Sequence, residues 1–119
     1  MTTIGEKNMI EDDYYDGRIN IGTSQYYSWQ LVYNHHTSPD ILCGMVKHES
    51  VEIRRAIADN PSTPPDALNI LSRDFDIYVR RLVTRNRNTP AGVLACLTKD
   101  EDSEIRQLAI WNIQIAHLN

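Results

Sequence analysis

The sequence of 119 residues lacks several features that would assign a protein to a class at once. It contains no apolar run approaching the roughly 20 residues of a membrane-spanning helix. Its first residues are acidic and polar, a pattern that does not fit a signal peptide. Only two cysteines are present, Cys43 and Cys96, and they form no C-x-x-C motif. We therefore expect reduced thiols in a cytoplasmic protein, with one disulfide between them as the open alternative.

Sequence motifs of catalysis are also missing. There is no glycine-rich phosphate loop, no G-x-S-x-G and no H-E-x-x-H. His35 and His36 fall in a turn after a predicted helix, where a solvated polar pair is a simpler interpretation than a metal site. We expect each of Cys43 and Cys96 to be a small buried thiol. We therefore expect no catalytic residue, no metal and no cofactor.

What the sequence does contain is an internal repeat of 26 residues. The recurring residues are Asn34, Asn60, Asn86 and Asn112; Thr37, Thr63 and Thr89; Leu42, Leu68 and Leu94; and Arg54, Arg80 and Arg106. So many coincident recurrences without an insertion predict stacked units, none of which buries its apolar face alone. The units are residues 24–49, 50–75, 76–101 and, incompletely, 102–119.

Each unit begins with the pattern of an amphipathic helix. A residue that can cap a helix occupies one position in all units: Ser24, Ser50, Asp76 and Asp102. Apolar residues follow three, six and seven places later, as in Ile53, Ala56 and Ile57, and the recurring asparagine ends the stripe. We expect the amide of this asparagine to be hydrogen-bonded and to tie down the following turn.

A second, shorter helix is predicted directly after that turn. Thr63 and Asp66 flank two prolines, which suits a helix start with threonine as the cap. Leu68 and Leu71 would be the buried pair of this helix, for which we expect partly 3₁₀ geometry. The predicted fold is an all-α, single-domain solenoid of about three and a half helix–turn–short-helix repeats. An acidic N-terminal arm or cap, residues 1–23, precedes it.

Residues 24–112 resemble the leucine-rich repeat variant family, whose unit reads V-R-x-A-V-A-x-N-P-x-T-P-x-x-x-L-x-x-L. The residues that carry the resemblance are Ile53, Arg54, Ala56 to Ala58, Asn60, Pro61, Thr63, Pro64, Leu68 and Leu71. The first unit departs from the pattern at Ser28 and His35, and the third at Arg87. The resemblance implies a right-handed stack of alternating α and 3₁₀ helices, similar to HEAT and armadillo solenoids, that offers an interaction surface. Some members carry an N-terminal iron–sulfur module, but no cysteine precedes residue 43 here.

Arginines are the main candidates for function, because residues 53–90 contain seven of them and no lysine. Three belong to the repeat motif and are expected to pair with acidic linkers: Arg54, Arg80 and Arg106. Four others are outside the motif and are either internal ion-pair partners or a binding face: Arg55, Arg81, Arg85 and Arg87. Arginine suits fixed carboxylates and phosphates. The net charge of −4 favours a protein partner, with a nucleic-acid backbone as the alternative.

Aromatic residues mark both ends of the predicted stack. Trp29 and Tyr33 lie on the first helix, and Trp111 shares the outward position of Tyr33 on the last. They are covered either by the chain's own ends, residues 1–23 and 113–118, or by a partner or a second copy of the chain. We predict a small non-enzymatic adaptor or inhibitor that binds one protein through an arginine and aromatic face.

Overall fold

The computed structural model describes residues 25–118, and the side chains of residues 28–116. Within this range the chain forms seven α-helices and no strand. They are α2 (Gln25–Tyr33), α3 (Pro39–Gly44), α4 (Val51–Asp59), α5 (Pro65–Leu71), α6 (Ile77–Arg85), α7 (Ala91–Leu97) and α8 (Ser103–Leu118). None of these helices combines the length and apolar character that crossing a membrane requires. The predicted arm, residues 1–23, and the predicted cap at Ser24 lie outside the described residues.

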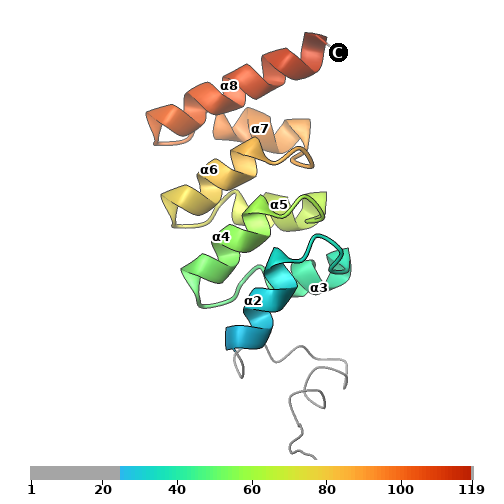
Figure 1. Ribbon diagram of the computed structural model, residues 1–119. Helices are drawn as coiled ribbons and strands as arrows, with labels where there is room; N and C mark the ends of the chain where they lie inside the picture. The colour runs from blue at the N-terminus through green and yellow to red at the C-terminus, as the bar shows by residue number, and fades with distance from the viewer. Residues whose placement is uncertain (1–24, 119) are drawn as a thin grey trace, which may run out of the picture.

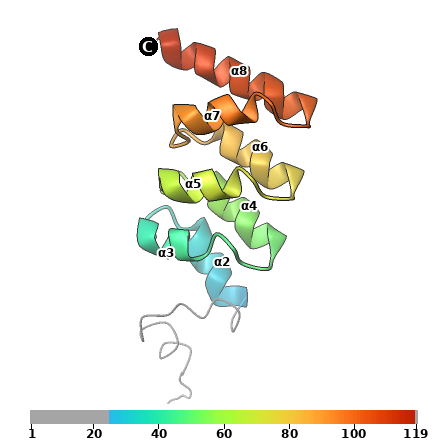
Figure 2. The ribbon, with the colours of Figure 1, turned by 180° about the vertical axis from the view of Figure 1, so that it is seen from behind.

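The helices form two layers along one stack. α2, α4, α6 and α8, here called the first helices, lie side by side in one layer (Figure 1). The shorter α3, α5 and α7, here called the second helices, form the other layer (Figure 2). α4, α6 and α8 begin at residues 51, 77 and 103, so the helices follow the 26-residue period of the sequence. The prediction of an all-α fold built from short, regularly spaced helices is confirmed.

The first helices begin at the predicted caps. Ser50 Oγ accepts a hydrogen bond from the Ile53 N–H at 3.4 Å, and Asp76 Oδ2 accepts one from the Val79 N–H at 2.9 Å. These bonds satisfy N–H groups that have no partner inside the helix. The apolar stripes that follow are buried in the core: Ile53, Ala56, Ile57, Val79, Val83, Ile105 and Ala109. The burial confirms the face predicted from the spacing of apolar residues.

The second helices are α-helices whose ends also carry 3₁₀-type hydrogen bonds, as from the Arg73 N–H to the Ile70 carbonyl and from the Ile41 N–H to the Ser38 carbonyl. In α5 the N–H groups of Leu68 and Ser72 donate to carbonyls four residues earlier, at 3.1 and 2.9 Å. Proline at the start of α5 is compatible with an α-helix, because N–H groups of the first turn have no intrahelical acceptor. Leu68 and Leu71 are buried, as predicted.

The recurring threonine is a buried donor and not a helix cap, which corrects the prediction for Thr63. Its Oγ1 donates a 2.6 Å hydrogen bond to the Ile57 carbonyl in the last turn of α4, and its side chain is fully buried. Thr37 and Thr89 make the same contact with the preceding first helix in their own units. Carbonyls in the last turn of a helix have no intrahelical donor, so a hydroxyl close to them in the core satisfies a buried group.

The recurring asparagine joins each unit to the one before it. Asn60 Oδ1 accepts a 2.9 Å hydrogen bond from the Ser62 N–H in its own turn, as predicted. Its Nδ2 also donates to the carbonyls of Val32 and Asn34 in the preceding unit, at 2.8 and 3.2 Å. Asn86 makes the equivalent bonds one unit further along. One side chain therefore fixes both a turn and the contact between two units.

The first helix of the fourth unit, α8, does not end at its recurring asparagine. α8 runs for 16 residues, against nine in α4 and in α6, and continues past Asn112. The residues after Asn112 include no proline and no threonine, so nothing in the sequence stops the helix there. Asn112 Nδ2 makes a single 2.6 Å hydrogen bond to the Thr84 carbonyl. The described part of the fourth unit therefore forms no turn that could pack on the turn of the third unit.

We expect the Asn60→Ala substitution to lower the free energy of unfolding by about 3 kcal/mol, because two main-chain carbonyls lose their donor in or near the core. The measurement is urea denaturation of the full chain. Asn112→Ala is the matched control, since it removes one bond at the end of the stack and should cost about 1 kcal/mol. Equal losses in the two variants would contradict the role assigned to Asn60.

Candidate functional site

Two of the three motif arginines, Arg54 and Arg80, pair with linker carboxylates as predicted. Arg106 does not pair with a carboxylate of the described residues and donates instead to the carbonyls of Asp100 and Glu101. Arg54 Nε donates to Asp74 Oδ2 at 2.7 Å, and its Nη1 donates to the His48 carbonyl at 2.8 Å. Arg80 repeats both contacts one unit later, with Asp100 and with the Asp74 carbonyl, each at 2.9 Å. The hydrogen bond with Asp100 raises the pKa of Arg80 above its ordinary value. Both guanidinium groups are thus engaged inside the stack.

Two of the four other candidate arginines also have carboxylate partners. Arg55 donates from Nε and Nη2 to Asp76, at 2.8 and 2.9 Å. Arg81 Nη2 lies 2.5 Å from Glu104 and 3.8 Å from Asp102. Asp76 and Asp102 are also the residues that accept from the first turns of α6 and α8. Each arginine is therefore fixed against the start of the next first helix.

Arg85 and Arg87 differ from the other candidates. Both are exposed, and no carboxylate among the described residues pairs with either. Arg85 ends α6, and Arg87 lies in the turn that follows. Both line a groove of about 370 Å³ between this turn and the C-terminal part of α8.

Tyr78 is an exposed aromatic residue that the repeat pattern did not single out. Its ring lies between the guanidinium groups of Arg55 and Arg81, which are 4.8 and 5.3 Å from the ring centroid. The residue is 51% exposed. The second and fourth units carry Glu52 and Glu104 at this position, and the first unit carries Tyr26. The difference from the acids of the two neighbouring units was a signal that could have identified Tyr78.

Phe75 is a second aromatic residue at a position where the other units have an acid. Glu49 and Glu101 occupy the equivalent linker positions. The Phe75 side chain is fully exposed, at 101%. Arg55, Phe75, Tyr78 and Arg81 are here called the aromatic–arginine patch.

Tyr33 and Trp111 face outward at the ends of the stack, whereas Trp29 is partly buried and packs against the core. Trp29 and Tyr33 stack on each other with ring centroids 5.1 Å apart. Tyr33 is 63% exposed and Trp111 is 59% exposed. The alternative in which residues 113–118 cover the last helix is wrong, because these residues continue it. Cover by residues 1–23 lies outside the described residues.

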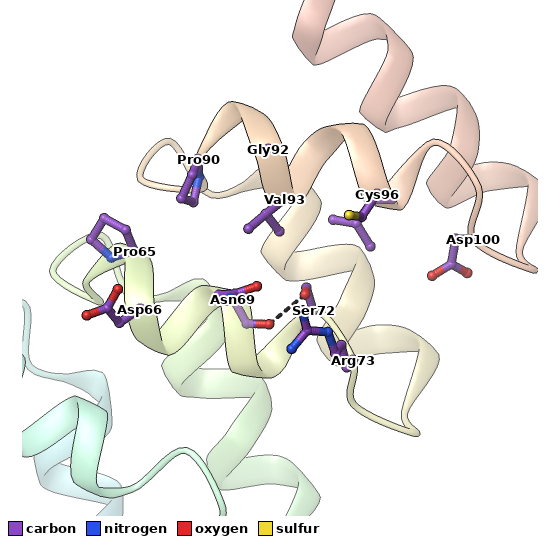
Figure 3. A pocket seen from close by; sticks show the side chains of 11 residues that line it. Pro65, Asp66, Asn69, Ser72, Arg73, Pro90, Gly92, Val93, Cys96 and Asp100 are labelled. Carbon is purple, nitrogen blue, oxygen red and sulfur yellow. Dashed lines mark hydrogen bonds between the residues drawn. The ribbon is translucent and has the colours of Figure 1, made fainter.

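A second groove, of about 430 Å³, lies between α5 and α7 in the layer of second helices (Figure 3). Asp66 and Arg73 line it from the two ends of α5, and Cys96 faces it from α7. Cys96 is exposed and Cys43 is partly buried, so the prediction of two buried thiols is wrong. Both are free thiols, and burial, followed by the charges of Asp66 and Asp40, raises the pKa of Cys43.

The described residues hold no group of three or more histidine, cysteine or acidic side chains placed to bind a metal ion. Comparison of the chain with protein-family models, with curated proteins and with solved structures gave no match. What the structure shows is a small all-helical protein with short helices in a repeating pattern.

Asp76 makes the stability of the fold depend on pH in the acid range. The hydrogen bond from Arg55 and the one from the Val79 N–H hold the pKa of Asp76 below its ordinary value. The unfolded chain therefore takes up this proton first as the pH falls. The contribution of Asp76 is complete above about pH 4 and is lost as the pH falls through the lower pKa of the folded state.

We expect the free energy of unfolding to fall less steeply with acidification in Asp76→Asn than in the wild type. The asparagine keeps an oxygen that can cap α6 but has no carboxylate to protonate. Urea denaturation from about pH 5 to about pH 2 measures this difference. Identical slopes in the two proteins would show that Asp76 does not contribute to acid denaturation.

Proposed function

We propose that this protein is a non-enzymatic protein-binding module, an adaptor or inhibitor, whose partner docks on the aromatic–arginine patch. The observation that carries the proposal is the half-exposed Tyr78 ring between two guanidinium groups. Tyrosine, tryptophan and arginine dominate the binding energy of protein interfaces. Asp76 and Glu104 already hold Arg55 and Arg81 in position. Docking on the patch therefore orders few additional side chains, which favours affinity.

The same layer of first helices extends the surface toward both ends of the stack. Tyr33 and Trp111 occupy the outward position of α2 and α8, and both are more than half exposed. The resemblance of the repeat to the leucine-rich repeat variant unit supports the same conclusion, because that family implies interaction surfaces and no common chemistry.

Nucleic-acid binding through the arginines is the second candidate. Its support is weaker because Arg54, Arg55, Arg80 and Arg81 are paired with carboxylates. Binding to a phosphate backbone takes several positive charges that are free to replace counterions. Among the described residues, the arginines whose side chains make no hydrogen bond or ion pair are Arg73, Arg85 and Arg87. Arg73 lines the α5–α7 groove, apart from the other two.

We expect the double substitution Phe75→Glu and Tyr78→Glu to abolish capture of the partner while the fold stays intact. Glu49 and Glu101 occupy the position of Phe75, and Glu52 and Glu104 that of Tyr78, so the repeat tolerates glutamate at both. Losing one hot-spot side chain costs about 2 kcal/mol or more, which is roughly 30-fold in affinity. Full-length protein is used as bait in nuclease-treated host lysate, and the affinity of the captured protein is then measured by calorimetry.

Ile70→Ser is the matched control, because Ile70 is an exposed apolar residue on the layer of second helices. It should leave capture unchanged, and all variants should melt within a few degrees of the wild type. Capture that survives in the double variant would contradict the assignment of the patch. Nucleic-acid binding would be favoured if nuclease removes the captured material. The affinity of the protein for that material should then fall steeply between about 50 and about 200 mM salt. A dimer that forms without any partner, detected by light scattering, would favour self-association.

A further inference from the structure

The turn of the third unit lies between α6 and α7. It differs from the other two turns because no described side chain of the next unit donates hydrogen bonds to its carbonyls. In the second unit, the turn is covered by Asn88, whose Nδ2 donates to the carbonyls of Pro61 and Thr63 at 2.6 and 3.0 Å. A side chain of the second unit covers the first turn in a similar way. Because α8 continues as a helix, no side chain of the described residues donates to the equivalent carbonyls of Arg87 and Thr89. The carbonyls of Arg87 and Thr89 therefore lack the side-chain donor that their equivalents in the second unit have.

The uncovered turn and α8 enclose the groove of about 370 Å³, here called the end groove. Leu94 lies on one side of it, and Asn112 and Ile115 line it from α8. Leu94 is 8% exposed, whereas the equivalent Leu42 and Leu68 are fully buried. The apolar surface of the third unit is thus more open than that of the units before it.

The end groove carries a local positive charge that the other units lack. Arg85 and Arg87 both line it, and neither has a carboxylate partner among the described residues. In the second unit the equivalent positions are Asp59 and Pro61, so no pair of arginines recurs there. Neither arginine takes part in the contacts that hold the stack together.

We propose that the end groove binds an extended acidic segment of a partner protein. Its carboxylates pair with Arg85 and Arg87, whose planar guanidinium groups form charge-assisted hydrogen bonds with carboxylates. An aliphatic side chain of the segment packs on Leu94 and Ile115. The segment's main-chain N–H groups donate to the carbonyls of Arg87 and Thr89, as extended peptides do when they dock on unpaired main chain.

An acidic peptide fits this groove better than a nucleic acid does. Two arginines match the charge of a short acidic segment, whereas a phosphate backbone is bound through a longer row of charges. The apolar part of the groove matches an aliphatic side chain and has no aromatic residue on which a base could stack. The end groove is separate from Phe75 and Tyr78, so this inference stands or falls independently of the docking surface proposed above.

The test is a selection of binders from a random peptide library displayed on phage, with the full-length protein immobilised. We expect the selected peptides to combine aspartate or glutamate with leucine, isoleucine or valine. Fluorescence polarisation of one labelled peptide then gives its affinity. The Arg85→Gln and Arg87→Gln double variant should bind it at least about tenfold more weakly, because two charge-assisted hydrogen bonds are lost.

Arg73→Gln is the matched control, since Arg73 is also an exposed arginine without an ion pair but lines the other groove. It should leave the affinity unchanged, and so should Phe75→Glu with Tyr78→Glu. Three outcomes overturn the proposal: no selected peptide, selected peptides without acidic residues, or equal losses of affinity in the Arg73 variant and the double variant.

Other occupants of the end groove give distinct results, and each overturns the partner assignment. Tighter peptide binding after Asp12→Asn and Asp13→Asn would identify the chain's own acidic segment as the occupant. A dimer in light scattering that the Arg85→Gln and Arg87→Gln variant dissociates would identify a second copy. Displacement of the labelled peptide by a single-stranded oligonucleotide would identify a nucleic acid.

Discussion

The buried asparagine amide is the contact on which the stack of helices depends. The second helices have six or seven residues, so each buries only a few apolar side chains and cannot by itself fix its place. Asn60 and Asn86 solve this problem, because each binds its own turn through Oδ1 and the preceding unit through Nδ2. A hydrophobic side chain could fill the same space, but it would leave main-chain carbonyls unsatisfied. This is the physical reason for a polar residue at the end of an apolar stripe.

Ion pairs between arginines and carboxylates within the stack neutralise most of the arginine charge. Arg54 and Arg80 each bind a carbonyl at the end of the preceding unit and a carboxylate near the end of their own unit. At the first junction both partners are replaced together, since Ser28 stands where the arginine would be and the buried His48 where the acid would be. The joint replacement indicates that the arginine and the acid act as one structural element. A count of arginines in the sequence therefore overstates the charge that is free to meet a ligand.

The helix positions, the capping residues and the buried face could be predicted from the sequence, because each depends on residues close together in the chain. The role of Thr63 could not be predicted. A threonine between two helices can either cap the second helix or donate to a carbonyl of the first, and only the packing of the two helices determines which contact forms. The partners of Arg55 and Arg81 lie 21 to 23 residues further along the chain, so they depend on how neighbouring units stack. Tyr78 could have been found by comparing the units position by position.

Several departures from the repeat lie in or next to the third unit. Phe75, the last residue of the second unit, and Tyr78 stand where neighbouring units have acids, and Arg85 and Arg87 replace Asp59 and Pro61 of the unit before. The same unit keeps the asparagine, the motif arginine and the cap, so its fold needs none of these changes. The Phe75 side chain is fully exposed, and Arg85 and Arg87 form no ion pair among the described residues, so the stack does not depend on these three side chains. Their position close to the uncovered turn is the physical basis for proposing that partners bind at this end of the described stack.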